Sequence, residues 1–218
     1  MLLSHPNKFI QLKTVKTAST SIEIYFQRYC AIRGRISKKT CTLISPKGIV
    51  ASRGCKSHLR TEWHEHMTAR EVKDKVEPDV WNNYLKFCSI RNPYDRAVSW
   101  FYFRMKKHLA DDWTLSQLQE CFENFTLKGF GSDREIYCID DELIIDDCVR
   151  YDHLGEDMEA LCKKLGVPWQ PELMGKNLSN FRPANSEPSR LFTETAKAHV
   201  AKVCDVEIDL LGWEFPKS

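Results

Sequence analysis

The apolar residues of the chain fall into short runs that alternate with longer, periodic segments. Two short runs, at Lys8–Lys13 and Leu85–Ile90, have the length and composition of buried strands, and a third strand is expected at Asp147–Asp152. A further short strand is expected at Cys41–Ser45. It lies inside the basic, turn-rich segment 34–60, which we otherwise interpret as a loop region crossing the surface.

Apolar residues spaced three or four apart predict helices between and after these strands. The expected helices run from Thr20 to near Gly34, over Thr68–Val76 with Thr68 as the cap, over Asp79–Tyr84 as one short turn, and over Tyr94–Lys107, Gly155–Leu165 and Thr193–Val203. Strands that alternate with helices predict an α/β fold, in which a P-loop-like central parallel sheet carries helices on both faces. We find no repeat and no domain boundary, so we predict one domain over residues 1–218.

The composition narrows the classes of function. The chain has 218 residues, of which 42% are hydrophobic, and its formal net charge is +2. A charge this small indicates no strong attraction to nucleic acid or to a membrane surface. The nine cysteines include no CxxC pair, which argues for buried thiols in a reducing compartment. Without a signal-peptide core or an 18-residue apolar span, we expect a cytoplasmic protein with neither a nucleic-acid nor a membrane partner.

The first predicted strand leads into five small residues in a row, Thr17–Ser21. Small side chains let backbone amides approach an anion closely. Thr20 and Glu23 have the spacing of a capping box, which would begin a helix and point its unpaired N–H groups and positive dipole end into the turn. Lys16 stands where its ammonium can reach the same anion. The stretch therefore predicts a phosphate or sulfate site, and an ordinary strand-to-helix connection is the alternative.

A second polar motif follows the second predicted strand. Arg91 leaves the strand, and Ser99 lies eight residues later on the predicted helix. The Arg91 guanidinium and the Ser99 hydroxyl could both donate hydrogen bonds to one phosphate. Asp95 is expected either to cap the helix or to pair with Arg96. Alone, this motif also fits a capped helix with surface charges. Because ligands bind beyond the carboxyl ends of strands in open α/β sheets, we expect both motifs at that edge.

Together, the motifs KTASTS from Lys16 and RNPYDRAVS from Arg91 resemble the sulfotransferase superfamily, whose members use 3′-phosphoadenosine 5′-phosphosulfate (PAPS) as sulfuryl donor. Val15 departs from that family, which commonly has Pro at this position. A similarity to the Golgi-type carbohydrate sulfotransferases and their bacterial relatives extends over Glu65–Glu71, Trp81–Ser99, Asp147–Leu154 and Leu161–Pro168. The resemblance implies metal-free transfer of a sulfuryl group from PAPS to a hydroxyl or amine of a small-molecule or glycan acceptor.

The resemblance also implies residue roles. Lys16 would contact the oxygen that bridges phosphate and sulfuryl group and neutralise charge on the leaving phosphate. Backbone amides of the turn, with the Thr20 and Ser21 hydroxyls, would hold the 5′-phosphate, and Arg91 with Ser99 would hold the 3′-phosphate. In the family a C-terminal basic loop often closes over the nucleotide, and Lys176, Arg182 and Arg190 all fit that role. The predicted cofactor-binding residues are Lys16, Thr17, Ala18, Ser19, Thr20, Ser21, Arg91, Ser99 and Arg182.

Trp63–His66 supplies the base that the acceptor needs. His66 resembles the histidine that some carbohydrate sulfotransferases place against the acceptor, and imidazole titrates near neutrality, so it can take the proton of the attacking group. We therefore predict Lys16 and His66 as catalytic residues. His58, His64 and Glu65 are the rival bases. A cluster of His and Glu could also bind a metal. However, its histidines lack the i, i+4 spacing of metal ligands on a helix, and no matching Cys or His pair follows.

Two other functions fit parts of the pattern, a P-loop-type nucleotide kinase and a non-catalytic nucleotide-binding module. A kinase of this type needs G-x-x-x-x-G-K-[ST], but the turn holds no glycine and its lysine precedes the small residues. The acidic runs Asp111-Asp112, Asp140–Glu142 and Asp146-Asp147 bear on the acceptor. If one of them lines the pocket, it favours a neutral or cationic small acceptor over a polyanionic glycan.

Overall fold

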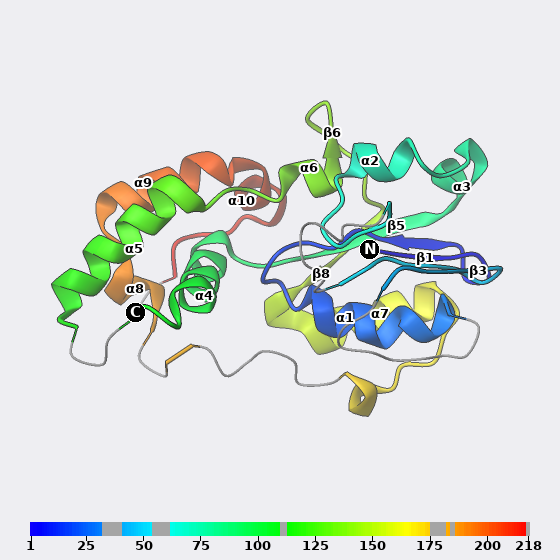
Figure 1. The fold of residues 1–218 in the computed structure, drawn as a ribbon, viewed down its shortest axis with the longest axis horizontal. Helices are drawn as coiled ribbons and strands as arrows, with labels where there is room; N and C mark the ends of the chain where they lie inside the picture. The colour runs from blue at the N-terminus through cyan, green and yellow to red at the C-terminus, as the bar shows by residue number, and fades with distance from the viewer. Residues whose placement is uncertain (32–40, 54–61, 110–112, 175–181, 184–185, 217–218) are drawn as a thin grey trace. The chain divides into compact units, whose positions relative to one another are not determined.

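The structure, a computed structural model, describes residues 1–31, 41–53, 62–109, 113–174, 182–183 and 186–216. The chain divides into two compact units (Figure 1). Unit 1 consists of Met1–Ile90 and Glu135–Asn177, and unit 2 consists of Arg91–Arg134 and Leu178–Ser218. One domain over residues 1–218 stays a prediction.

Unit 1 is built on a six-stranded sheet with the strand order β3-β4-β1-β2-β5-β8. The strands are β1 (Leu2–Ser4), β2 (Phe9–Gln11), β3 (Leu43–Ser45), β4 (Gly48–Val50), β5 (Leu85–Ile90) and β8 (Asp147–Arg150). β2, β5 and β8 run parallel, and the Leu12 N–H donates to the Phe87 carbonyl at 2.8 Å. The α/β fold is thus confirmed, and the carboxyl ends of β2 and β5 are neighbours as expected.

The other half of the sheet is antiparallel and corrects the prediction of a loop region at 34–60. β4 is buried and pairs with both β1 and β3. Gly48 begins β4 with a φ of +140°, and a Cβ there would lie 1.9 Å from the Leu3 carbonyl oxygen, so this approach requires glycine. β1 and β4 were not predicted, because these three-residue strands are specified by their pairing with each other across the chain rather than by a local pattern.

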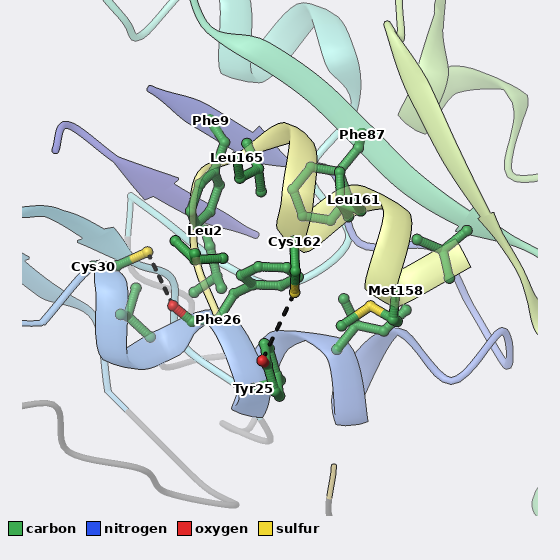
Figure 2. Close-up of a cluster of buried hydrophobic side chains, with 14 of the residues drawn as sticks. Leu2, Phe9, Tyr25, Phe26, Cys30, Phe87, Met158, Leu161, Cys162 and Leu165 are labelled. Carbon is green, nitrogen blue, oxygen red and sulfur yellow. Dashed lines mark hydrogen bonds between the residues drawn. The ribbon is translucent and has the colours of Figure 1, made fainter. Parts of the chain in front are cut away.

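Helices flank both faces of this sheet (Figure 1). α1 (Ser19–Phe26) and α7 (Leu154–Lys164) lie on one face, and α2 (Ala69–Lys73) and α3 (Pro78–Asn83) lie on the other. The first face carries the main core, in which Phe26 and Leu161 pack on Phe9 and Phe87 of the strands (Figure 2). Each fully buried Leu or Phe contributes roughly 1.5–3 kcal/mol to stability. On the second face, Lys86 Nζ of β5 donates to the Trp81 carbonyl at 3.1 Å.

Local capping explains most helix boundaries in unit 1. Thr68 caps α2 and forms a capping box with Glu71, as predicted. α7 ends at Lys164 with Leu165 as its C-cap, and the φ of +65° at Gly166 lets the Val167 N–H donate to the Cys162 carbonyl at 3.0 Å. The shorter elements are η1 (Gln27–Tyr29), which ends the first helix before the predicted position, α6 (Arg134–Tyr137), β6 (Cys138–Ile139), β7 (Glu142–Leu143), η3 (Tyr151–His153) and η4 (Pro171–Leu173).

Unit 2 is helical. It contains α4 (Pro93–Met105), α5 (Leu115–Gly129), α8 (Pro188–Leu191), α9 (Glu194–Val203) and α10 (Asp205–Leu211). Phe101, Phe122 and Val200 share one buried cluster. The Asn92 side chain caps α4 by accepting the Tyr94 N–H at 3.0 Å. Among the described residues, no helix has the length and apolar character that crossing a membrane requires.

Candidate functional site

The segment between β2 and α1 forms a turn at the carboxyl end of β2. Lys16 and Ala18 both have a φ of +63°, and left-handed residues of this kind let successive backbone N–H groups converge on one side of a turn. Because α1 begins at Ser19, the amides of Ser19 and Thr20 have no acceptor within the helix, whereas the Ser21 N–H donates to the Ala18 carbonyl at 2.9 Å, and the positive end of the helix dipole lies at the turn. The backbone of Lys16–Ser21 therefore has the geometry that suits an anion.

The capping box predicted for Thr20 and Glu23 is wrong. Ala18 occupies the N-cap position of α1, no side chain caps this helix, and Thr20 lies in its first turn. Glu23 is fully buried and forms ion pairs with Lys13 at 2.7 Å and with Arg53 at 2.8 Å. A buried carboxylate needs charged partners of this kind, and these occupy the side chain that would have closed the capping box.

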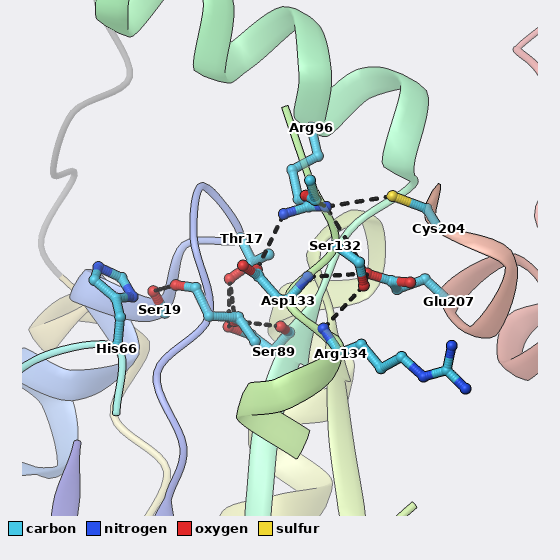
Figure 3. A network of polar contacts seen from close by, with 12 residues as sticks. Thr17, Ser19, His66, Ser89, Arg96, Ser132, Asp133, Arg134, Cys204 and Glu207 are labelled. Atoms are coloured by element: carbon cyan, nitrogen blue, oxygen red, sulfur yellow. Dashed lines mark hydrogen bonds and ion pairs between the residues drawn. The ribbon is translucent and has the colours of Figure 1, made fainter. Parts of the chain in front are cut away.

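Hydroxyl groups fix the turn against β5 (Figure 3). Thr17 Oγ1 lies 2.7 Å from Thr14 Oγ1 and 2.8 Å from Ser89 Oγ, and Thr14 Oγ1 donates to the Ser89 carbonyl at 2.5 Å. Ser19 Oγ donates to the Thr14 carbonyl at 2.5 Å. The Thr17 and Ser19 side chains thus hold the shape of the turn. Because their hydroxyls bond within the protein, an anion at the turn would bind their backbone amides instead. Thr14 and Ser89 are not among the predicted site residues, and their only signal in the sequence is that they are small polar residues at predicted strand ends.

A buried cluster of four charges precedes the turn. Lys13, whose side chain is 1% exposed, places Nζ 2.7 Å from Glu23 Oε2 and 2.9 Å from Glu65 Oε2. Arg53 Nη1 contacts the same Glu23 oxygen at 2.8 Å. Burial alone would raise the pKa of Glu23, but the amino group of Met1, followed by Lys13 and Arg53, holds the pKa below its ordinary value. The ion pairs tie α1 to the segment after β2 and to the segments around residues 53 and 65.

His66 lies beside this cluster. Its Nδ1 is 2.8 Å from the Lys13 carbonyl oxygen. A carbonyl oxygen only accepts, so Nδ1 carries the proton and Nε2 keeps its lone pair. Burial, followed by the positive charge of Lys13, lowers the pKa of His66 to about 4. The prediction that this ring titrates near neutrality is therefore wrong, and at neutral pH Nε2 is a proton acceptor.

The rival bases lie differently. His64 Nδ1 contacts the Glu65 carbonyl oxygen at 2.9 Å, and its Nε2 is 3.9 Å from Glu71. His66, in contrast, is hydrogen-bonded to the residue that leads into the turn. His58 lies outside the described residues. Within the described part of the chain, no group of three or more His, Cys, Asp or Glu side chains is arranged to hold a metal ion.

In unit 2, Asp95 brings two of the predicted cofactor-binding residues together. Arg91, which directly follows β5, donates from Nε to Asp95 Oδ2 at 2.6 Å, and its Nη2 is 2.5 Å from the same oxygen. Arg182 donates to the other Asp95 oxygen and, at 2.8 Å, to Ser186 Oγ. Ser99 lies one helical turn beyond Asp95 on α4 and is half-buried.

Arg96 is not the partner of Asp95, contrary to one alternative from the sequence. It is buried and places Nη1 3.2 Å from Asp133 and Nη2 3.8 Å from Glu207, and it donates to the Gly131 carbonyl at 2.7 Å (Figure 3). A buried guanidinium needs partners of this number and charge. Arg96 therefore holds α4, the segment around residue 131 and α10 together within unit 2.

The remaining predicted residues have varied positions. Lys176 and the run Asp111-Asp112 lie outside the described residues. The exposed Arg190 offers its carbonyl to Gln119 Nε2 at 2.7 Å. Of the other acidic runs, Asp140 pairs with Arg70 at 2.6 Å and Asp147 pairs with Lys164 at 2.9 Å. These acidic side chains thus have basic partners on the surface of unit 1.

A comparison with protein families gives one match. A model described as "Sulfotransferase family" matches residues 1–211, which includes both motifs, the turn at Lys16 and the segment from Arg91. No curated protein and no solved structure matches the chain.

Proposed function

Because the chain belongs to the sulfotransferase family, we propose that it transfers a sulfuryl group from PAPS to a hydroxyl or amine, with His66 as general base. Family membership supports sulfuryl transfer in general. The identities of the donor, the base and the acceptor are what we propose. The observation that carries it is the turn at Lys16–Ser21, in which Lys16 and Ala18 have left-handed backbones and which follows the Lys13 carbonyl that His66 Nδ1 contacts at 2.8 Å. Closeness to the Golgi-type enzymes and a cytoplasmic location also remain predictions.

The turn suits the 5′-phosphosulfate end of the donor. In the proposal, the backbone amides of Thr17–Thr20 hold the 5′-phosphate together with the Thr20 and Ser21 hydroxyls, since the Ser21 amide donates to the Ala18 carbonyl. The hydrogen bonds from Thr14 and Ser89 fix the turn before the donor arrives. A preorganised site loses less conformational freedom on binding, so more of the interaction energy appears as affinity.

Arg91 and Ser99 are the proposed ligands of the 3′-phosphate, and Arg182 is the proposed residue of the closing loop. Asp95 contacts both guanidinium groups and so sets their orientation. An oriented, planar guanidinium suits a phosphate because it presents parallel N–H donors. The same contact links any movement of Arg182 to the position of Arg91.

The proposed transfer is an in-line displacement at sulfur. His66 Nε2 accepts the proton of the acceptor hydroxyl or amine while the acceptor atom forms a bond to sulfur. The bond between sulfur and the phosphate oxygen breaks, and Lys16 stabilises the charge that develops on this oxygen. The products are the sulfated acceptor and 3′-phosphoadenosine 5′-phosphate (PAP), and the proton stays on His66 until solvent removes it.

A labelled-transfer experiment tests this function. The protein is incubated with [³⁵S]PAPS and a panel of glycans, phenols, sterols and amines, and Lys16→Ala protein is the matched control. We expect label in at least one acceptor with the wild type. Transfer of ³²P from [γ-³²P]ATP would instead support the nucleotide kinase. Binding of nucleotide with transfer from neither donor would support the non-catalytic module.

A further inference from the structure

Glu65 is the member of the charged cluster that faces the ring of His66. Its Oε2 accepts a hydrogen bond from Lys13 Nζ at 2.9 Å and lies 3.7 Å from His66 Nε2. Its side chain is 31% exposed. A single carboxylate oxygen thus faces both a buried lysine and the ring nitrogen to which the proposed function assigns the proton.

The backbone keeps Glu65 and His66 in this arrangement. His66 has a φ of +58°, a left-handed conformation that is uncommon for any residue other than glycine. Hydrogen bonds on both sides maintain it, because the Glu65 N–H donates to the Ser52 carbonyl at 2.9 Å and His66 Nδ1 donates to the Lys13 carbonyl at 2.8 Å. Nδ1 and Nε2 are therefore directed to different partners, the Lys13 backbone and the Glu65 side chain.

We propose that Glu65 is a positioning residue for sulfuryl transfer, whose carboxylate, held by Lys13, orients the His66 ring and stabilises the imidazolium formed when Nε2 takes the proton of the acceptor. This inference rests on the proposed role of His66. The proton stays on Nε2, and Glu65 forms no covalent bond and remains a carboxylate throughout.

The charges around the ring support this role. Burial lowers the pKa of His66 most, and the Lys13 ammonium lowers it further, as does the amino group of Met1 to a smaller extent. The hydrogen bond to the Lys13 carbonyl and the Glu65 carboxylate both raise it. Farther from the ring, Glu23 of α1 forms an ion pair with Lys13, and Arg53 forms an ion pair with Glu23. Of the side chains that face His66, Glu65 is thus the carboxylate that makes protonation of Nε2 more favourable.

Glu65→Gln removes this charge while keeping the size of the side chain and an oxygen that can accept from Lys13. We expect the transfer rate to fall about tenfold, since a unit charge at this separation in a partly exposed site has an effect of that order. PAP affinity should stay unchanged, and the His66 pKa, followed by NMR titration of the ring protons, should fall. Glu62→Gln is the matched control, because Glu62 is exposed and pairs with Lys75 at 3.4 Å. Glu65→Asp, which keeps the charge but withdraws it from the ring, should give a smaller loss and serves if the Gln variant does not fold.

A double-mutant cycle separates positioning from a structural role. In the His66→Ala background, Glu65→Gln should change the rate less than about twofold, because Glu65 acts through the missing ring. An equal loss in both backgrounds would overturn the inference. Loss of transfer in His66→Ala together with an unshifted His66 titration in Glu65→Gln would overturn the role of Glu65 alone. Unchanged transfer in His66→Ala would overturn this role together with the proposed general base.

Discussion

Replacing His66 by Ala is expected to lower the rate of sulfuryl transfer by about 10²–10⁴, the usual contribution of a general base. The reason is that Nε2 is the proton acceptor next to the turn, and Ala offers none. Nucleotide affinity should not change, because His66 contacts the protein through Lys13 and is assigned no donor contact. Steady-state transfer kinetics and calorimetric titration with PAP measure the two quantities separately.

The pH dependence of the transfer rate provides a second test of His66 as the base. The pKa of about 4 places the acidic limb of kcat/KM near pH 4, so the rate should be level from about pH 5 through neutrality as far as this group is concerned. A limb near neutrality would show that another group is the base. His64→Ala is the control, since its ring shares the segment but not the contact with Lys13. A collapse of transfer in His64→Ala with full activity in His66→Ala would move the base to His64.

Lys16→Ala should lower turnover by about 10²–10³, as expected when one preorganised electrostatic donor is lost. Nucleotide affinity should fall much less, because the lysine matters most when charge builds up on the departing phosphate oxygen. Single-turnover rates and PAP affinity are the measurements. Lys47→Ala, which removes an exposed lysine from the same unit, is the control. Equal losses in binding and turnover would make Lys16 a ground-state anchor instead.

The sequence predicted those parts of the fold in which local pattern decides structure. β2 and β5 were predicted because buried parallel strands are apolar runs, and α2 was predicted because Thr68 and Glu71 form a capping box. α5 carries the same signal in Thr114 and Gln117, which form a capping box, and this helix was missed. The three-residue strands β1 and β4 are specified by pairing with distant segments, which no local pattern reveals.

The candidate site likewise has a part that the local sequence predicts and a part that depends on the tertiary structure. The turn and the two motifs are local, so the sequence located them. Lys13 looks like an ordinary lysine at a strand end, and only the fold brings Glu23, Glu65 and the His66 ring to it. The lowered pKa of His66 likewise arises from burial and from Lys13, both of which depend on tertiary structure.

Calorimetric titration of the wild type and of Arg91→Ala with PAP in EDTA tests the central claim, that the protein uses PAPS without a metal. We predict that PAP binds the wild type without Mg²⁺ and that Arg91→Ala weakens it roughly ten- to a hundredfold, since a charge-assisted hydrogen bond contributes about 1.5–3 kcal/mol. Adenosine 5′-phosphosulfate, which lacks the 3′-phosphate, should bind both proteins equally. Failure of PAP to bind the wild type, with ATP binding only when Mg²⁺ is present, would contradict the account.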